Sequence, residues 1–218
     1  MGARVVMVED HALLAETLSL ALRIEGVEVV LAPLTDAAAL EQAVAAAAPC
    51  LVMLDLDLGP VGDGIALIPT FTALGSAVLV VTGDRNRVRL AEALAAGAIG
   101  YVTKDQPFEV LVETARRASM GNRLLDDNER QEMLAELRRA RAELDRRRAP
   151  FEALTPRERD VLDELAEGKS VEMIATEGYV STATVRTQVR GILTKLDVGS
   201  QLAAVAKARR AGWLSKSR

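Results

Sequence analysis

Short apolar runs alternate with stretches of helical periodicity along residues 1–120. The runs are rich in aliphatic and β-branched side chains, as the buried strands of parallel sheets are. They are Val5–Val8, Glu28–Leu31, Leu51–Leu54, Ala77–Val81 and Ile99–Val102. Strands that alternate with helices predict an α/β fold, here a five-stranded, doubly wound parallel sheet. In such sheets the functional crevice lies at the carboxyl ends of the strands.

The segment 124–149 has a different pattern. It contains no glycine or proline and is dense in strong helix formers, so it predicts one continuous helix. Met133, Leu137, Ala140 and Leu144 follow the 4-3-4 spacing of a short a/d stripe. The stripe is compatible with two arrangements, namely a coiled-coil seam between two copies of the chain or a helix that packs the stripe on its own domain.

A second start signal follows this helix. Pro150 is expected to end it, and Thr155, Pro156 and Glu158 have the order of an N-cap, a first helical residue and the partner of a capping box. Short helices are expected after this signal, with a break at Gly178-Tyr179. The second part of the chain is therefore expected to be all-α.

The length and the charge distribution agree with two functional parts. The chain has 218 residues, half of them hydrophobic, which suits two small domains with cores of their own. The expected parts are a domain at 1–120, a helical linker at 121–149 and an all-α domain at 150–218. Acidic residues outnumber basic ones in the first part, whereas Asp197 is the only acid from Gly178 onward. The basic tail suits a polyanionic partner.

Several classes of protein are disfavoured. A single cysteine, Cys50, leaves no internal disulfide and no four-cysteine zinc site. Residues 1–20 lack the charged and apolar regions of a signal peptide, and no uncharged apolar stretch reaches the roughly 18–20 residues that span a bilayer. We therefore expect a cytoplasmic protein with no membrane partner.

Polar side chains stand at or near the ends of the expected strands. Glu9 and Asp10 follow the first strand, Asp55 follows the third, and Thr82 and Lys104 follow the fourth and fifth. Three carboxylates at one edge of a sheet repel one another, and a hard divalent cation such as Mg²⁺ removes that cost. A carboxylate nucleophile flanked by a metal, a hydroxyl and an ammonium group can hold a phosphoryl group. The pattern therefore predicts Asp55 as a phosphoryl acceptor.

The segments VVMVEDH, LVMLDLDLGPVGDG, VLVVTGD and GYVTKD resemble the signature segments of response-regulator receiver domains. The resemblance implies the flavodoxin-like receiver fold, phosphorylation of Asp55, and contacts of Thr82 and Lys104 with the phosphoryl group. It implies that Tyr101 is the aromatic residue that changes rotamer on activation. The metal ligands that it implies are Glu9, commonly through water, Asp10, Asp55 and the backbone carbonyl of Asp57.

One departure from the family pattern concerns the loop after the acceptor. The family usually places proline four residues after the acceptor, followed closely by Asp-Gly, whereas here Gly59 precedes Pro60. The loop is therefore expected to be one residue longer, which affects its shape and partner contacts rather than the acceptor.

The basic tail has the pattern of a helix-turn-helix over Ser170–Val189. Ser181 can cap the second helix, and Val185, Val189 and Ile192 share its buried side. The exposed side carries residue types that contact bases or phosphates: Thr184, Arg186, Thr187, Gln188, Arg190 and Lys195. Such a helix fits the major groove, which is about 12 Å wide. From the pattern alone, a helical bundle whose basic face binds another protein is the alternative.

The segments LTPRERDVLDELAEG, MIA and VSTATVRTQVRGILTKLDV resemble the LuxR-type helix-turn-helix domain. The resemblance implies that Arg186 and Lys195 contact DNA. There are three departures: Gly178 stands where the family usually has a core leucine, Met173 where an acid is common, and Gln188 where histidine is frequent. Gly178 is expected to lower stability near the turn, with Tyr179 as a compensating side chain.

Together the two resemblances predict a NarL/FixJ-type response regulator, which is not an enzyme. Its expected partners are a sensor histidine kinase as phosphodonor, double-stranded DNA, and a second copy of the chain when active. Two alternatives stay open: a regulator that no longer uses phosphorylation, and a Mg²⁺-dependent phosphatase in which Asp57 of the Asp55-Leu56-Asp57 sequence acts as acid and base.

Overall fold

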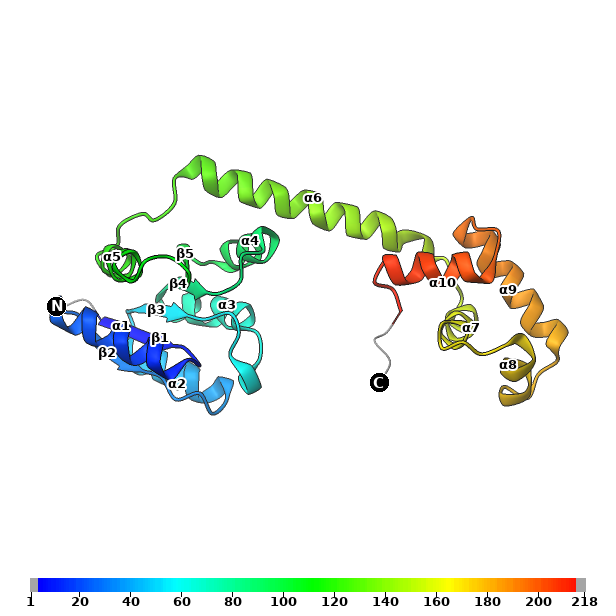
Figure 1. Ribbon diagram of the computed structural model, residues 1–218, viewed down its shortest axis with the longest axis horizontal. Coiled ribbons are helices and arrows are strands. Elements are labelled where there is room, and N and C mark those ends of the chain that lie inside the picture. The colour runs from blue at the N-terminus through cyan, green and yellow to red at the C-terminus, as the bar shows by residue number, and fades with distance from the viewer. Residues whose placement is uncertain (1–3, 215–218) are drawn as a thin grey trace. The chain divides into compact units, whose positions relative to one another are not determined.

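The computed structural model describes residues 4–214 (Figure 1). The chain divides into two compact units, which we call the α/β unit (Met1–Arg138) and the helical unit (Arg139–Arg218). Helix α6 (Asp127–Glu152) contributes residues to both. Among residues 4–214, no helix combines the length and the apolar character that a membrane crossing requires.

The α/β unit is built on a five-stranded sheet in which every strand pair is parallel. The strand order is β2-β1-β3-β4-β5, so β1 and β3 are neighbours. The strands are β1 (Arg4–Val8), β2 (Glu28–Leu31), β3 (Leu51–Leu54), β4 (Ala77–Thr82) and β5 (Gly100–Thr103). The predicted α/β class and the five parallel strands are confirmed, because fully apolar runs can be buried on both faces of a sheet.

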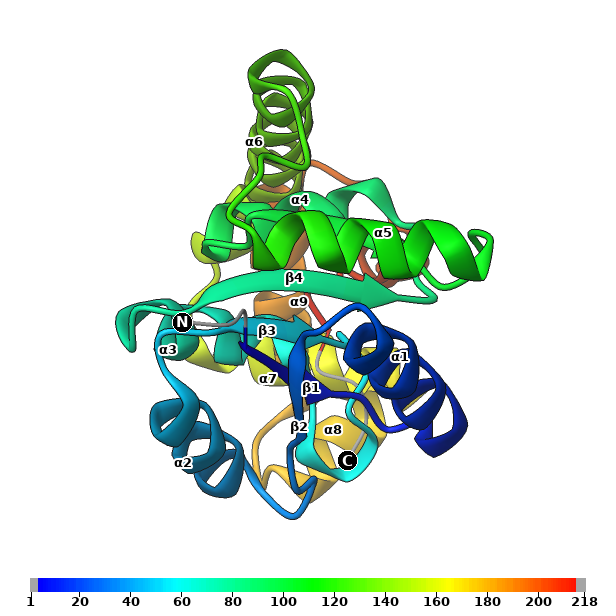
Figure 2. The same cartoon turned by 90° about the vertical axis from the view of Figure 1, so that its left-hand side faces the viewer.

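Helices cover both faces of this sheet (Figure 2). One face packs against α1 (Ala12–Ile24) and α5 (Phe108–Ser119). The other packs against α2 (Ala37–Ala47), α3 (Ile68–Ala73) and α4 (Arg87–Ala96). Two short 3-10 turns, η1 (Gly59–Val61) and η2 (Gly64–Leu67), lie between β3 and α3. The strand ends therefore stay open between two packed layers.

The first half of α6 belongs to the core of the α/β unit. Met133 and Leu137 are 0% and 3% exposed and pack in the same cluster as Leu94. The Arg130 guanidinium donates to the carbonyls of Leu94 and Ala98, at 2.9 and 3.0 Å. Of the two arrangements expected for the stripe, Met133 and Leu137 therefore adopt the one in which the helix packs on its own domain.

The expectation that Pro150 ends this helix is wrong. Helix α6 continues to Glu152 with Pro150 inside it. The missing amide removes only one hydrogen bond, close to the helix end. Continuing the helix also places Phe151, which is fully buried, against the Trp213 ring at a centroid distance of 5.2 Å.

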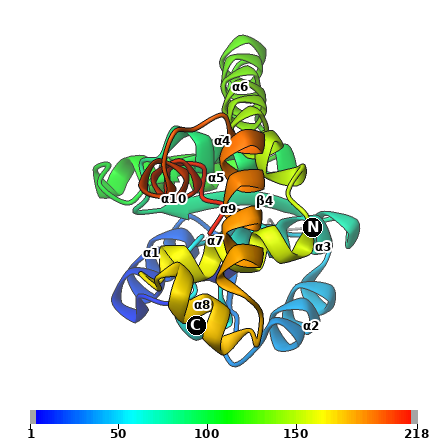
Figure 3. The ribbon, with the colours of Figure 1, turned by 90° about the vertical axis from the view of Figure 1, so that its right-hand side faces the viewer.

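Over residues 139–214, the helical unit contains four helices besides the end of α6, which Figure 3 shows from one side. They are α7 (Pro156–Ala166), α8 (Val171–Glu177), α9 (Thr182–Leu196) and α10 (Gln201–Arg210). The predicted capping box is present, since Glu158 Oε2 accepts from the Thr155 amide (2.7 Å) and Thr155 Oγ1 accepts from the Glu158 amide (3.3 Å). Ser181 caps α9 as predicted.

Candidate functional site

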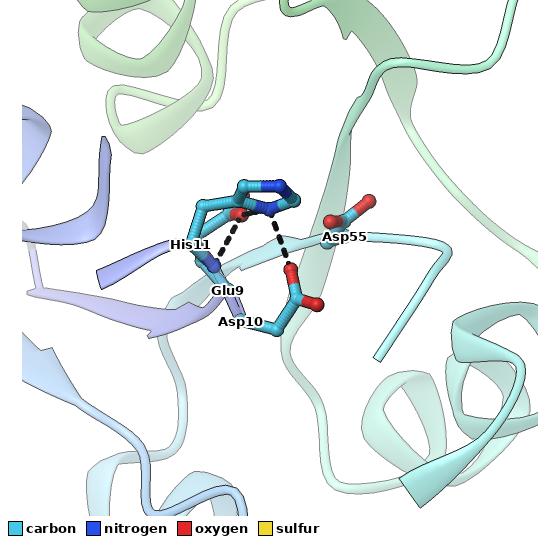
Figure 4. A group of neighbouring side chains, drawn as sticks. All are labelled: Glu9, Asp10, His11 and Asp55. Carbon is cyan, nitrogen blue, oxygen red and sulfur yellow. Dashed lines mark hydrogen bonds and ion pairs between the residues drawn. The ribbon is translucent and has the colours of Figure 1, made fainter. Parts of the chain in front are cut away.

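The register of β1 and β3 brings the predicted carboxylates together. Val8 pairs with Leu54, the last residues of their strands, so Glu9 and Asp10 emerge next to Asp55. The Asp55 amide donates to the Val8 carbonyl at 2.9 Å and continues the pairing. Figure 4 shows the side chains of Glu9, Asp10 and Asp55 at this common edge.

Lys104 reaches the acids from the other side of the crevice. It follows β5, and its amide donates to the Thr82 carbonyl at 2.8 Å. Its Nζ lies 2.6 Å from Asp55 Oδ2 and 2.6 Å from Glu9 Oε1. Burial acts to lower the pKa of Lys104, but the bonds and charges of Asp55 and Glu9 outweigh it and raise that pKa above the ordinary value. A cation is therefore held between two carboxylates.

The site is partly buried: Asp10 is exposed and Lys104 half-buried, whereas the other groups lie inside. Asp55 and Thr82 are each 2% exposed, and Glu9 is 7% exposed. Burial is the main influence on the Glu9 carboxyl and raises its pKa, although Lys104 and the His11 amide act in the opposite direction. Glu9 Oε2 has no hydrogen-bond partner within residues 4–214. One carboxylate oxygen thus remains unsatisfied in the crevice wall.

His11 joins this cluster, which the sequence reasoning missed. Its Nδ1 lies 3.0 Å from Glu9 Oε1 and 2.7 Å from Asp10 Oδ1 (Figure 4). Ligand atoms of Glu9, Asp10, His11 and Asp55 all lie within 4.8 Å of one another. The available signal was its place in the sequence, since the only histidine of the chain directly follows the acidic pair.

A cavity of about 550 Å³ opens over Asp55. Its lining includes Asp55, Asp57, Thr82 and Lys104, and also Arg89 of α4. Thr82 Oγ1 accepts a bond from the Asp84 amide at 3.1 Å. The predicted phosphoryl-binding side chains therefore face one space.

The loop after Asp55 is closed on itself. Asp57 forms an isolated antiparallel bridge with Asp63, and the extra residue lies in the turn η1, where Gly59 has a φ of +54°. Gly64 is required by a close approach, because a Cβ there would lie 2.2 Å from the Asp55 carbonyl oxygen. The longer loop changes the turn and leaves Asp55 at the strand end.

Tyr101 lies on β5 at the edge of the core that includes α6. It is half-buried and packs against the cluster that contains Met133 and Leu137. Burial raises the pKa of its phenol, and the charge of Glu129 on α6 adds to this shift. The expected switch residue is therefore close to the start of α6.

Helix α9 separates its buried side from its polar side as predicted. Val185, Val189 and Ile192 are buried. Among the expected DNA-contacting residues, Gln188 is half-buried. The exposed ones include Thr184, Arg186, Thr187 and Arg190. Lys195 is also exposed, and its Nζ lies 2.6 Å from Glu158 Oε2 of α7. Burial acts to raise the pKa of Glu158, but the bonds from Lys195 and Thr155 lower it below its ordinary value.

The expected roles of Gly178 and Tyr179 need correction. The Arg157 side chain fills the space next to Gly178, where a Cβ would lie 2.7 Å from Arg157 Nη2. Tyr179 is 97% exposed, so it does not compensate for a missing core side chain. The sequence pattern could not reveal this, because Arg157 comes from a different helix.

Comparison with known proteins agrees with both parts of the chain. A model of the response regulator receiver domain matches residues 5–116. A model of the bacterial regulatory proteins of the luxR family matches residues 152–208.

Relatives match along almost the whole chain. The probable transcriptional regulatory protein NarL of Mycobacterium tuberculosis is 31% identical over 208 residues, which are 95% of this chain and 94% of the relative. The nitrate/nitrite response regulator protein NarP of Escherichia coli is 31% identical over 206 residues, 92% of each chain. A solved structure of the NarL signal receiver domain from Mycobacterium tuberculosis is 27% identical, has a TM-score of 0.50 and covers 56% of this chain and 98% of its own. The chain belongs to the NarL/FixJ family of two-component response regulators, in which a receiver domain is joined to a LuxR-type DNA-binding domain.

Proposed function

We propose that Asp55 accepts a phosphoryl group from a partner histidine kinase and that this modification controls the binding of duplex DNA by the helical unit. The observation that carries the proposal is the position of Lys104 Nζ, 2.6 Å from both Asp55 Oδ2 and Glu9 Oε1. An ammonium group held at the acceptor oxygen is suited to neutralise an incoming phosphoryl group.

We further propose Mg²⁺ as the cofactor, held by Asp10, Asp55 and the Asp57 carbonyl, with Glu9 assisting. Oxygen ligands with room for water suit this cation. The Oε2 atom of Glu9, which has no hydrogen-bond partner within residues 4–214, supports a cation at this site. When bound, Mg²⁺ would neutralise the carboxylates and the charge on the phosphoryl oxygens.

The protein's own groups have distinct roles in this proposal. A carboxylate oxygen of Asp55 attacks phosphorus while the P–N bond to the phosphohistidine of the partner kinase breaks, and the kinase imidazole leaves. Lys104 then pairs with an oxygen of the transferred phosphoryl group. The Thr82 hydroxyl donates to another oxygen and leaves its bond with the Asp84 amide. Tyr101 changes rotamer when Thr82 and Lys104 move. Because Tyr101 packs on the same cluster as Met133, this change alters the packing of α6 on the α/β unit.

The helical unit would place α9 in the major groove of DNA. We assign base or phosphate contacts to Thr184, Arg186, Thr187, Gln188, Arg190 and Lys195, the last after its bond to Glu158 opens.

We also propose a cytoplasmic location and homodimers in the active state. The proposed domain bounds are 1–120 for the receiver domain, 121–149 for the linker and 150–218 for the DNA-binding domain. A phosphorylation-independent regulator, the alternative, would keep the same DNA contacts.

The test of the proposed function is DNA affinity before and after phosphorylation. We expect acetyl phosphate with Mg²⁺ to tighten duplex binding by roughly 5–150-fold, the usual range of an allosteric coupling. Fluorescence anisotropy with a duplex selected for binding from a random pool measures the change. Equal affinity of both forms, with phosphorylation verified by mass spectrometry, supports the phosphorylation-independent alternative instead.

Arg190→Ala is expected to weaken duplex binding and to flatten its dependence on salt by about one unit of slope, because one phosphate contact is lost. Lys195→Ala should weaken binding too, but it also removes the cationic partner of the buried Glu158 and lowers stability. Anisotropy titrations at several salt concentrations measure the loss of binding, and the Tm of each variant measures the loss of stability. Wild-type affinity and slope in both variants would contradict the groove assignment.

A further inference from the structure

The turn between α8 and α9 places Tyr179 in a backbone conformation that favours glycine. The Val180 amide donates to the Ala175 carbonyl (3.0 Å) and the Tyr179 amide to the Thr176 carbonyl (3.3 Å). These two bonds form the Schellman pattern, in which the residue after the C-cap is left-handed and usually glycine. Tyr179 has a φ of +51° there, whereas the preceding Gly178 has an ordinary φ of −84°. Glycine thus stands one residue before the position that needs it.

The Tyr179 side chain does not stabilise the fold through packing or hydrogen bonds. It is 97% exposed, and its phenol has no partner in the part of the chain that the structure describes. A residue with a Cβ pays a free-energy cost in the left-handed region, and glycine does not. Tyr179 therefore lowers the stability of the helical unit, which points to a partner outside the unit.

One base beside the turn, Arg157, can attract an anion. Arg157 lies beside Gly178, and its ion pair with Asp160 is long, at 3.9 Å. The acids of this region outnumber the bases that pair with them, because Glu172 pairs with Arg186 at 3.3 Å whereas Glu177 (2.7 Å) shares Lys169 with Glu164 and Glu167.

We propose that Tyr179 contacts DNA, with its phenol donating a hydrogen bond to a phosphate at the edge of the groove that receives α9. The inference rests on the proposed groove assignment of α9. Tyr179 precedes the N-cap Ser181 by two residues, in the turn that joins α8 to α9 (Figure 3), so a groove that takes the start of α9 brings a sugar-phosphate strand to this turn. Tyrosine hydroxyls contact phosphates and fix the register of a protein on the duplex. Arg157 adds a positive charge toward the same strand.

Two substitutions in the full-length protein separate a DNA contact from a structural role. Tyr179→Phe removes only the hydroxyl, and we expect it to weaken duplex binding by roughly 2–10-fold, the value of one hydrogen bond. Tyr179→Gly should weaken binding at least as much, yet raise the Tm of the helical unit because glycine suits the positive φ. Leu202→Ala, at a residue that is 80% exposed on α10, is the matched control and should change neither quantity.

The measurements use probes that the chain provides. Fluorescence of Trp213, the single tryptophan, reports unfolding of the helical unit, where its ring stacks on Phe151. Affinity is measured by anisotropy with a mixed-sequence duplex of about 30 base pairs, which exceeds two half-sites spaced by one helical turn. The salt slope of Tyr179→Phe should equal that of the wild type, because no charge is lost.

Wild-type affinity in Tyr179→Phe, or a lower Tm together with weaker binding in Tyr179→Gly, overturns the proposal. If Arg190→Ala weakens binding while both Tyr179 variants bind normally, the Tyr179 contact fails and the groove assignment stands. If Arg190→Ala also binds normally, both fail.

Discussion

Asp55→Asn is expected to abolish the phosphoryl adduct that the wild-type protein forms with acetyl phosphate and Mg²⁺. The Asp55 carboxylate lies against Lys104 and lines the cavity, and a neutral amide cannot replace it as a nucleophile. Intact-mass spectrometry of the full-length protein measures the adduct. The expected outcome is a mass increase of one phosphoryl group in the wild type and none in the variant.

Two controls make this result specific to the proposed site. EDTA should prevent the adduct in the wild type, since the carboxylates of the crevice need a cation to accept further negative charge. Asp57→Asn should still form the adduct, because Asp57 is assigned only a backbone carbonyl. Sustained phosphate release from small monoesters that is lost in Asp57→Asn would instead support the phosphatase alternative. An unlabelled wild type would reject the acceptor proposal.

Met133→Ala and Leu137→Ala are each expected to destabilise the α/β unit by about 2–5 kcal/mol, as large-to-small changes in a core do. Both side chains are almost fully buried in the cluster that also contains Leu94. Urea unfolding followed by circular dichroism measures the loss, while Trp213 fluorescence follows the helical unit separately. The helical unit should unfold as in the wild type.

Leu144→Ala is the matched control from the same stripe. Leu144 is 39% exposed, so its truncation should leave the stability of the α/β unit unchanged. Sedimentation equilibrium tests the coiled-coil alternative in the same variants. Unchanged unfolding of Leu137→Ala together with weaker self-association would contradict packing on the chain's own domain and support a seam between copies.

Local pattern was enough to predict the sheet and most of the site. Five apolar runs became five parallel strands because buried parallel strands need apolar side chains on both faces. The order of the carboxylates, Thr82 and Lys104 at successive strand ends placed them at one edge, since parallel strands share a direction. The capping box of Thr155 and Glu158 formed as predicted because its bonds span only three residues.

Other features depend on partners that are distant in the sequence, and no local pattern contains them. Asp55 joins Glu9, Asp10 and His11 because β1 and β3 pair. Met133 packs in the same cluster as Leu94 of α4, and Arg130 of the same helix donates to the carbonyls of Leu94 and Ala98. Pro150 stays helical because the following Phe151 is buried against Trp213.

The sequence by itself therefore determined the class of fold, the convergence of Asp55, Glu9, Asp10, Thr82 and Lys104 at the strand ends, and the helix-turn-helix. The tertiary structure decided which surfaces are filled and which residues are free for a partner. Lys195 is engaged by Glu158, Gly178 is covered by Arg157, and Tyr179 is left exposed. Periodicity specifies which face of a helix is apolar, whereas the side chain that meets that face is set by packing between elements far apart in the chain.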